Sequence, residues 1–266
     1  MTTMAESPRL RVTLVQQPLA WHDAAANREH FDALLAPLAG ETDLIVLPEM
    51  FTTGFSMDVE QFAEEAGGAT SAWLERKSRE LRAAVTGSVM SKEGSHFYNR
   101  MFWSEPGASL RHYDKRHLFR MANEHQRFTA GEHSLVVAWR GFRICPLVCY
   151  DLRFPVFSRR RPDLEYDVLI YAANWPAPRR QAWRALLKAR AIENLSFVIG
   201  VNRIGTDGKN LPYAGDSVAH DFMGEPLAEL GSEAAVITVE LDLSALRAFR
   251  ERFPAHLDAD RFTLDP

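Results

Sequence analysis

Short apolar runs recur along the chain and predict buried strands. Residues 10–16 alternate in polarity and are rich in β-branched side chains, whereas residues 43–48 and 167–172 are apolar almost throughout. Alternation is typical of a strand with one buried face, and a continuous apolar run of this length is typical of a strand buried on both faces. Further strands are predicted over 84–90, 98–103, 110–113, 135–139, 142–148, 197–202, 215–220 and 234–240.

Segments with apolar residues at helical spacing lie between these strands. The first predicted helix begins at Ala24, where Asp23 can cap it, and ends near Ala39, where Pro37 can kink or stop the last turn. Further helices are predicted over 70–83, 179–194 and 243–253. Two strand pairs, 98–103 with 110–113 and 135–139 with 142–148, are typical of antiparallel hairpins and fit poorly in a doubly wound parallel sheet. The pattern therefore favours an α/β fold, a layered sandwich with mixed sheets.

Composition narrows the class of protein further. The 266 residues are 46% hydrophobic and 25% charged, which suits a globular protein with a large core. No break in composition marks a linker, so we expect a single domain over residues 1–266. With a net charge of −4, the chain as a whole lacks the basic character typical of a nucleic-acid-binding protein, and we expect no nucleic-acid partner. The first residues do not resemble a signal peptide, and no apolar run is long enough to cross a membrane, so we expect a cytoplasmic protein.

Cysteine occurs only twice, as Cys145 and Cys149. Four residues apart on one predicted strand, the two side chains share a face but lie too far apart for an easy disulfide bond. This spacing disfavours a redox protein that uses the two thiols as a pair. It also fits a reducing compartment.

The stretch from Ile144 to Pro155 combines a buried strand with an abrupt end in a cysteine. A cysteine at a strand end can point its sulfur into a pocket, and the backbone N–H of Tyr150 then lies where an oxyanion donor is useful. Asp151 can cap a short helix after the turn, and Pro155 fits the first turn of that helix. The alternative is that Cys149 is a small apolar core residue.

Two other predicted strands lead to ionisable side chains, Glu49 and Lys115. A thiol nucleophile must lose a proton, and a partly desolvated carboxylate can accept it. A lysine beside them can hold that carboxylate and stabilise the oxyanion of a tetrahedral intermediate. Glutamate, lysine and cysteine therefore form a complete set for acyl transfer without histidine. Taken singly, Glu49 can be a hydrogen-bonding loop residue and Lys115 a solvated surface residue.

The motifs LPEMF at 47–51, YDKRHL at 113–118 and CYDLRFP at 149–155 resemble the nitrilase superfamily of carbon–nitrogen hydrolases. The resemblance implies that Glu49 is the base, Lys115 the catalytic lysine and Cys149 the nucleophile. It also implies a four-layer α-β-β-α sandwich, no metal or organic cofactor, and a homodimer or larger homo-oligomer. Glu124 lies 25 positions before Cys149, where many members carry a second glutamate that polarises the site and orients the lysine and the substrate.

Within that superfamily, CYDLRFP followed by YAANWP at 171–176 resembles the omega-amidase branch, which hydrolyses the terminal amide of 2-oxoglutaramate and 2-oxosuccinamate. Such substrates end in a carboxylate, so the site should hold a cation. Arg153 suits this role, although it can instead form a structural ion pair with a residue such as Asp151. Trp175 and Phe51 can wall the substrate pocket, or can be ordinary core residues.

Two alternatives stay open at the level of sequence. One is a different activity of the same superfamily, such as a nitrilase or an N-carbamoyl amidohydrolase. The other is a binding module on the same fold without catalysis, against which the intact glutamate, lysine and cysteine argue.

Overall fold

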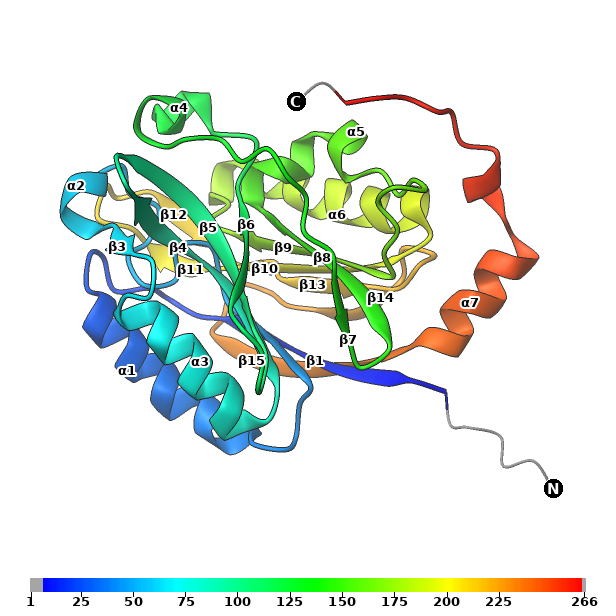
Figure 1. The fold of residues 1–266 in the computed structure, drawn as a ribbon, viewed down its shortest axis with the longest axis horizontal. Helices are drawn as coiled ribbons and strands as arrows, with labels where there is room; N and C mark the ends of the chain where they lie inside the picture. Colours follow the sequence, from blue (N-terminus) through cyan, green and yellow to red (C-terminus); the bar gives the residue numbers. More distant parts are fainter. Residues whose placement is uncertain (1–6, 265–266) are drawn as a thin grey trace.

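Two β-sheets packed face to face form the centre of the protein, and helices cover their outer faces (Figure 1). The computed structural model describes residues 7–264. Helices α1 (Ala24–Leu35) and α3 (Ala69–Leu81) lie against one sheet, and α6 (Arg180–Asn194) lies against the other. The four layers therefore follow the order α-β-β-α, as the resemblance to the nitrilase superfamily implied.

The first sheet places three parallel strands at its centre. In the described residues its strand order is β15-β1-β2-β4-β5-β6, with the short β3 beside β4. Strands β1, β2 and β4 run parallel to one another, whereas β15, β5 and β6 are antiparallel to their neighbours. The bounds are β1 Arg9–Gln16, β2 Leu44–Val46, β3 Glu64–Glu65, β4 Ala84–Glu93, β5 His96–Ser104, β6 Arg111–Asp114 and β15 Ala235–Asp242.

The second sheet is built in the same way. Its order is β14-β13-β10-β9-β8-β7, with β8, β9 and β10 parallel and the outer strands antiparallel. The bounds are β7 Val137–Trp139, β8 Phe142–Val148, β9 Val168–Ala173, β10 Phe197–Asn202, β13 Val218–His220 and β14 Pro226–Glu229. Both sheets are therefore mixed. The loops that follow their parallel strands leave from carboxyl ends, where open α/β sheets commonly bind ligands.

Burial on both faces explains why the central strands are apolar throughout. In β2, Leu44 and Val46 pack between the two sheets, whereas Ile45 packs with Phe31 of α1 and Trp73 of α3. All three β2 side chains are completely buried. Full burial of one aliphatic side chain contributes about 1.5–3 kcal/mol to the free energy of unfolding. The residues that lead to Glu49 are thus held firmly from both sides.

All the predicted strands and long helices are present, with shifted ends. Helix α1 begins where Asp23 accepts a hydrogen bond from the N–H of Ala26 at 2.9 Å, and it gives way to a 3-10 turn at Ala36–Leu38 that contains Pro37. The last helix, α7, spans Leu243–Arg252. Short elements without a distinct pattern were not predicted: α2 (Val59–Phe62), α4 (Glu124–Arg127), β11 (Ile204–Thr206), β12 (Pro212–Ala214) and β14.

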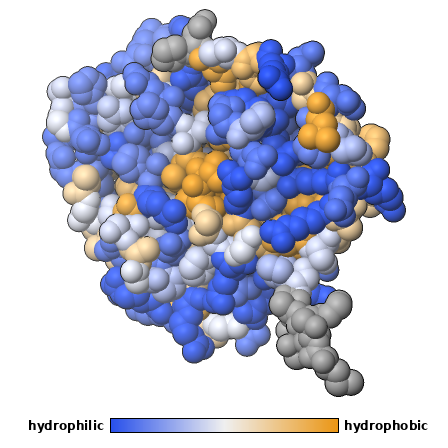
Figure 2. Space-filling view, turned by 45° about the vertical axis from the view of Figure 1, so that its right-hand side comes forward, coloured by the Kyte–Doolittle hydropathy of each residue, from blue (hydrophilic) through white to orange (hydrophobic). Residues whose placement is uncertain are grey.

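Polar residues cover most of the face shown in Figure 2, and apolar residues gather in a small area near its centre. This is the distribution that a chain with a large buried core should show. Between residues 7 and 264, no helix combines the length and the apolar character that a membrane span needs.

Candidate active site

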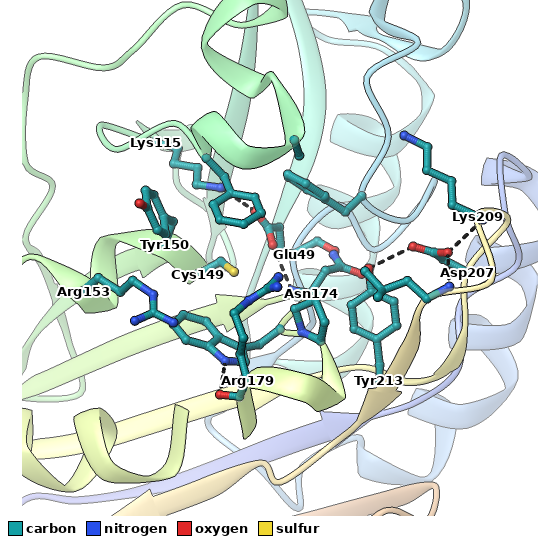
Figure 3. Close-up of a pocket in the computed structure, with 16 residues that line it drawn as sticks. Glu49, Lys115, Cys149, Tyr150, Arg153, Asn174, Arg179, Asp207, Lys209 and Tyr213 are labelled. Atoms are coloured by element: carbon teal, nitrogen blue, oxygen red, sulfur yellow. Dashed lines mark hydrogen bonds and ion pairs between the residues drawn. The ribbon is translucent and has the colours of Figure 1, made fainter. Parts of the chain in front are cut away.

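Loops from both sheets bring three of the predicted catalytic residues, Glu49, Lys115 and Cys149, together in one pocket (Figure 3). Glu49 follows β2 of the first sheet, and Lys115 follows β6 of the same sheet. Cys149 follows β8 of the second sheet directly, and Trp175 comes two residues after the parallel neighbour β9. The fold therefore explains how residues far apart in the sequence meet in one place.

Cys149 occupies a strained backbone conformation at the start of a 3-10 turn, η3 (Cys149–Arg153). Its φ angle is +43°, in the left-handed region that residues other than glycine rarely adopt. Such a conformation costs about 1–3 kcal/mol and persists only where the surroundings hold it. This conformation turns the chain sharply at the end of β8, and the Cys149 side chain lines the pocket.

Asp151 holds this turn in place. Its carboxylate accepts hydrogen bonds from the N–H of Val148 at 3.0 Å, the hydroxyl of Tyr113 at 2.8 Å and the N–H of His117 at 3.1 Å. The prediction that Asp151 caps the following helix was wrong. That helix, α5 (Pro155–Ser158), has Phe154 as its N-cap residue, because the Asp151 side chain points back to the loop that carries Lys115. Pro155 does occupy the first turn.

Lys115 lies between two buried glutamates. Its Nζ donates to Oε1 of Glu49 at 2.9 Å and to both carboxylate oxygens of Glu124 at 3.0 and 2.9 Å. All three side chains are almost completely shielded from solvent. The structure thus places Glu124 beside the lysine. A buried charged group of this kind is tolerated only where partners compensate it.

Asn99 of β5 was not predicted, although it links the two glutamates. Its Nδ2 donates to Oε1 of Glu49 at 2.8 Å and to Oε1 of Glu124 at 3.1 Å. Its Oδ1 accepts from the hydroxyl of Ser88 at 2.8 Å, which fixes the orientation of the amide. Asparagine is depleted in strands, so an asparagine at the centre of a long strand was the available signal.

Asn174 approaches Glu49 from the second sheet. Its backbone N–H donates to Oε2 of Glu49 at 2.8 Å, and its side-chain amide donates to the backbone oxygen of the same residue. The Glu49 carboxylate is therefore held by both sheets. Its position relative to Cys149 depends on the packing of one sheet on the other.

Burial and charge set the protonation states of the cluster. Burial raises the pKa of the Cys149 thiol well above its usual range, and the charge of Glu49 and a hydrogen bond to it act in the same direction. The charge of Lys115 lowers this pKa, but by less than these effects raise it. Burial lowers the pKa of Lys115, but the charges of Glu124 and Glu49 raise it by more, so it stays an ammonium. Burial also raises the pKa of Glu124, against the opposing effect of Lys115. The resting thiol is protonated and lies beside a carboxylate that can take its proton.

Aromatic and basic side chains wall the pocket beyond the cluster. Tyr150, Trp175 and Arg153 all line it, and the guanidinium of Arg153 stacks over the Trp175 ring at 4.8 Å from the ring centre. In the described part of the chain no carboxylate forms an ion pair with Arg153, and Asp151 is engaged elsewhere. The alternative of an Arg153–Asp151 ion pair is therefore contradicted.

Phe51 does not line the pocket, so that prediction was wrong. Its ring is completely buried and packs against Phe31 and Trp73, with ring centres 5.7 Å apart in each case. The turn after Glu49 sends the Phe51 side chain to the helix-covered face of the first sheet. Cys145 is also a core residue, since it lies between the sheets and burial raises its pKa to about 12.

Four polar residues that line the pocket were not predicted as site residues: Arg179, Asp207, Lys209 and Tyr213. Asp207 accepts hydrogen bonds from the hydroxyl of Tyr213 at 3.0 Å and from the N–H of Lys209 at 2.8 Å, which shapes the loop between β11 and β12. They lie in or beside short irregular segments without a periodic pattern. Within residues 7–264 no group of three or more metal-ligating side chains is placed to hold a metal ion.

Comparisons with known proteins agree with this geometry. The chain is 49% identical over 258 residues to omega-amidase YafV of Escherichia coli K12, covering 97% of this chain and 99% of that protein. It is 32% identical over 250 residues to 2-oxoglutaramate amidase of Bacillus subtilis 168, covering 93% and 96%. The crystal structure of XC1258 from Xanthomonas campestris, a CN-hydrolase superfamily protein with an arsenic adduct in the active site, has a TM-score of 0.94 and 50% identity, covering 97% and 99%.

A family model covers most of the chain. The model for carbon–nitrogen hydrolases matches residues 11–251, a range that contains Glu49, Lys115, Glu124 and Cys149. The resemblance that the three motifs suggested is thereby confirmed at the level of the family. The chain belongs to the carbon–nitrogen hydrolase family.

Proposed function

We propose that this protein is an omega-amidase that hydrolyses the terminal amide of short 2-oxo dicarboxylic monoamides, such as 2-oxoglutaramate and 2-oxosuccinamate, through a cysteine thioester. One observation carries the proposal: the Cys149 thiol lies beside the Glu49–Lys115–Glu124 cluster in a pocket that also presents the unpaired guanidinium of Arg153. The first part supplies acyl-transfer chemistry, and the second supplies a binding partner for a substrate carboxylate.

In the first half of the reaction Cys149 attacks the amide carbon while Glu49 accepts the thiol proton. The raised pKa of the thiol means that proton transfer accompanies attack, rather than preceding it. Lys115 and the N–H of Tyr150 stabilise the negative charge that develops on the amide oxygen. Glu49 then passes its proton to the departing nitrogen, and ammonia leaves a thioester on Cys149.

Water completes the reaction by the reverse sequence of proton transfers. Glu49 removes a proton from the water molecule that attacks the thioester carbon, and the same donors hold the second oxyanion. When the carbon–sulfur bond breaks, Glu49 returns the proton to the Cys149 sulfur. Glu124 and Asn99 contact no reacting atom in this scheme, and their role is to hold Lys115 and Glu49 in position.

The proposed substrate class is supported by the charge of Arg153 and by the names of similar proteins. An amidase for a small dicarboxylic monoamide must neutralise a carboxylate that it partly desolvates, and Arg153 offers a planar cation that forms no ion pair with residues 7–264. The relatives named omega-amidase and 2-oxoglutaramate amidase support the same class. An ammonia-release assay on 2-oxoglutaramate, a short aliphatic nitrile and an N-carbamoyl amino acid tests the proposal. Preferential hydrolysis of either of the last two would overturn it.

Replacing Arg153 by methionine should separate charged from neutral substrates. The variant keeps the approximate length of the side chain and removes its charge. We expect 2-oxoglutaramate to lose about 2–5 kcal/mol of transition-state binding, the penalty for a lost charge pair, and its kcat/KM to fall accordingly. The kcat/KM for a neutral short amide should fall far less. Steady-state kinetics on the matched pair measures this. If Arg153 only braces the η3 turn, both substrates lose equally and the melting temperature drops.

A further inference from the structure

A second arginine reaches the same pocket from a different element. Arg179 is the last residue of the 3-10 turn η4 (Ala177–Arg179) and the N-cap residue of α6. Its side chain lines the same pocket as Cys149 and Arg153 (Figure 3). Its guanidinium stacks over the Phe119 ring at 5.2 Å from the ring centre. No carboxylate among residues 7–264 forms an ion pair with it, although most arginines of this chain have such a partner.

Trp175 connects the two arginines. The face of its indole ring supports the guanidinium of Arg153, and its ring N–H donates to the backbone oxygen of Arg179 at 2.9 Å. Trp175 is nearly fully buried, and its backbone N–H donates to Oδ1 of Asn202 at 2.8 Å. One rigid aromatic residue therefore fixes both the side chain of Arg153 and the main chain of Arg179.

The charged side chains of the pocket differ in whether they have a partner of opposite charge. Lys115 is already matched by the two glutamates that bind it, and Asp207 is hydrogen-bonded to its own loop. Arg153 and Arg179 are held by aromatic rings instead of carboxylates. An aromatic face orients a guanidinium but leaves its in-plane N–H donors free for an anion. Among the cations that line the pocket, Arg153, Arg179 and Lys209 therefore have no carboxylate partner between residues 7 and 264, and only the two arginines present planar sets of donors.

We propose that Arg179 is a second specificity-determining residue, which with Arg153 forms a clamp for the 2-oxo acid end of the substrate. The inference rests on the proposed omega-amidase function and deepens it. A carboxylate offers two oxygens to one guanidinium in a bidentate pair, and the adjacent keto group offers a third oxygen. Two arginines supply donors for all three oxygens, whereas one arginine satisfies a plain carboxylate. The clamp thus favours 2-oxo acids over acids that lack the keto group.

The test compares three five-carbon amides that differ only at the far end: 2-oxoglutaramate, glutaramate and pentanamide. For Arg179→Met we expect kcat/KM to fall at least about thirtyfold on 2-oxoglutaramate, less on glutaramate, and under about threefold on pentanamide. Arg179→Lys should recover part of the loss, because it restores the charge without the planar fork. Arg184→Met is the matched control, since Arg184 lies on α6, forms a surface ion pair with Glu229 and does not line the pocket. It should change none of the three values beyond about twofold.

A double-variant cycle tests whether the two arginines act on the same anion. If both contact it, the loss in Arg153→Met/Arg179→Met on 2-oxoglutaramate should be smaller than the product of the single losses. Multiplicative losses, or equal losses on all three amides, would overturn the clamp. No loss in Arg179→Met would overturn it as well.

Failure of the proposed function is distinguished by the wild-type protein. If wild type prefers pentanamide to 2-oxoglutaramate, the omega-amidase proposal fails, and the clamp is then tested with 2-oxoglutarate as a competitive inhibitor of pentanamide hydrolysis. We expect its inhibition constant to rise at least about tenfold in Arg179→Met and to stay unchanged in Arg184→Met. An unchanged constant in Arg179→Met contradicts the clamp whatever the natural substrate is.

Discussion

Cys149→Ala should abolish amide hydrolysis while leaving the fold intact. The side chain is small, the substitution removes one sulfur atom, and the strained turn is held by hydrogen bonds to Asp151 that do not involve the sulfur. Without a thiol no thioester can form, and loss of a covalent nucleophile typically lowers the rate by a factor of about 10⁴–10⁶. Ammonia release from 2-oxoglutaramate at matched protein concentration measures the effect.

Cys145→Ala is the matched control for this experiment. Cys145 lies on β8, the strand that Cys149 follows, but packs between the sheets and does not line the pocket. Its replacement should lower the melting temperature slightly through a small cavity and leave kcat close to wild type. Mass spectrometry with a slowly hydrolysed substrate should locate the acyl adduct on the peptide that contains Cys149. Comparable turnover in Cys149→Ala and wild type would end the assignment of the nucleophile.

The fold was predictable because its strands are buried on both faces. Segments such as 43–48 and 167–172 are apolar throughout, and this pattern is difficult to satisfy except in a sheet with covered faces. The hairpins then excluded a purely parallel sheet. The short strands β11 and β12 carry no such pattern, since β11 is partly exposed and includes Gly205. Their position depends on tertiary contacts, which local sequence does not encode.

The sequence motifs predicted much of the site: the candidate catalytic residues, and also Tyr150, Arg153 and Trp175 of the pocket wall. Glu49, Lys115 and Cys149 stand at the ends of recognisable strands, and motifs surround them. The supporting residue Asn99 has only a weak local signal, its place in the middle of a strand. Asn99 reveals its role only when β5 lies beside Glu49 and Glu124, and Phe51 is sent to the core by a turn whose direction the sequence does not state. Geometry at the junction of two sheets decides both.

Lys115→Met should impair stability and catalysis together. The wild-type ammonium is the only cation bonded to Glu49 and Glu124 among residues 7–264, and both carboxylates are completely buried. Removing one member of a buried ion-paired group is expected to cost about 3–5 kcal/mol in the free energy of unfolding, because the remaining charges are left uncompensated. Burial already raises the pKa of Glu124, so without the lysine this carboxylate should take up a proton more readily. The oxyanion also loses a donor, which alone lowers kcat by about 10²–10³.

A second variant separates these two effects. In Lys115→Met/Glu124→Gln only one of the two carboxylates that bound the lysine is left, Glu49, which still accepts hydrogen bonds from Asn99 and Asn174. The free energy of unfolding, measured by urea titration, should therefore recover part of the loss seen in Lys115→Met. Activity should not recover, because the oxyanion donor is still missing. Near-normal kcat in folded Lys115→Met would contradict the catalytic role of the lysine. A double variant no more stable than the single variant would show that uncompensated charge is not the cause of the instability.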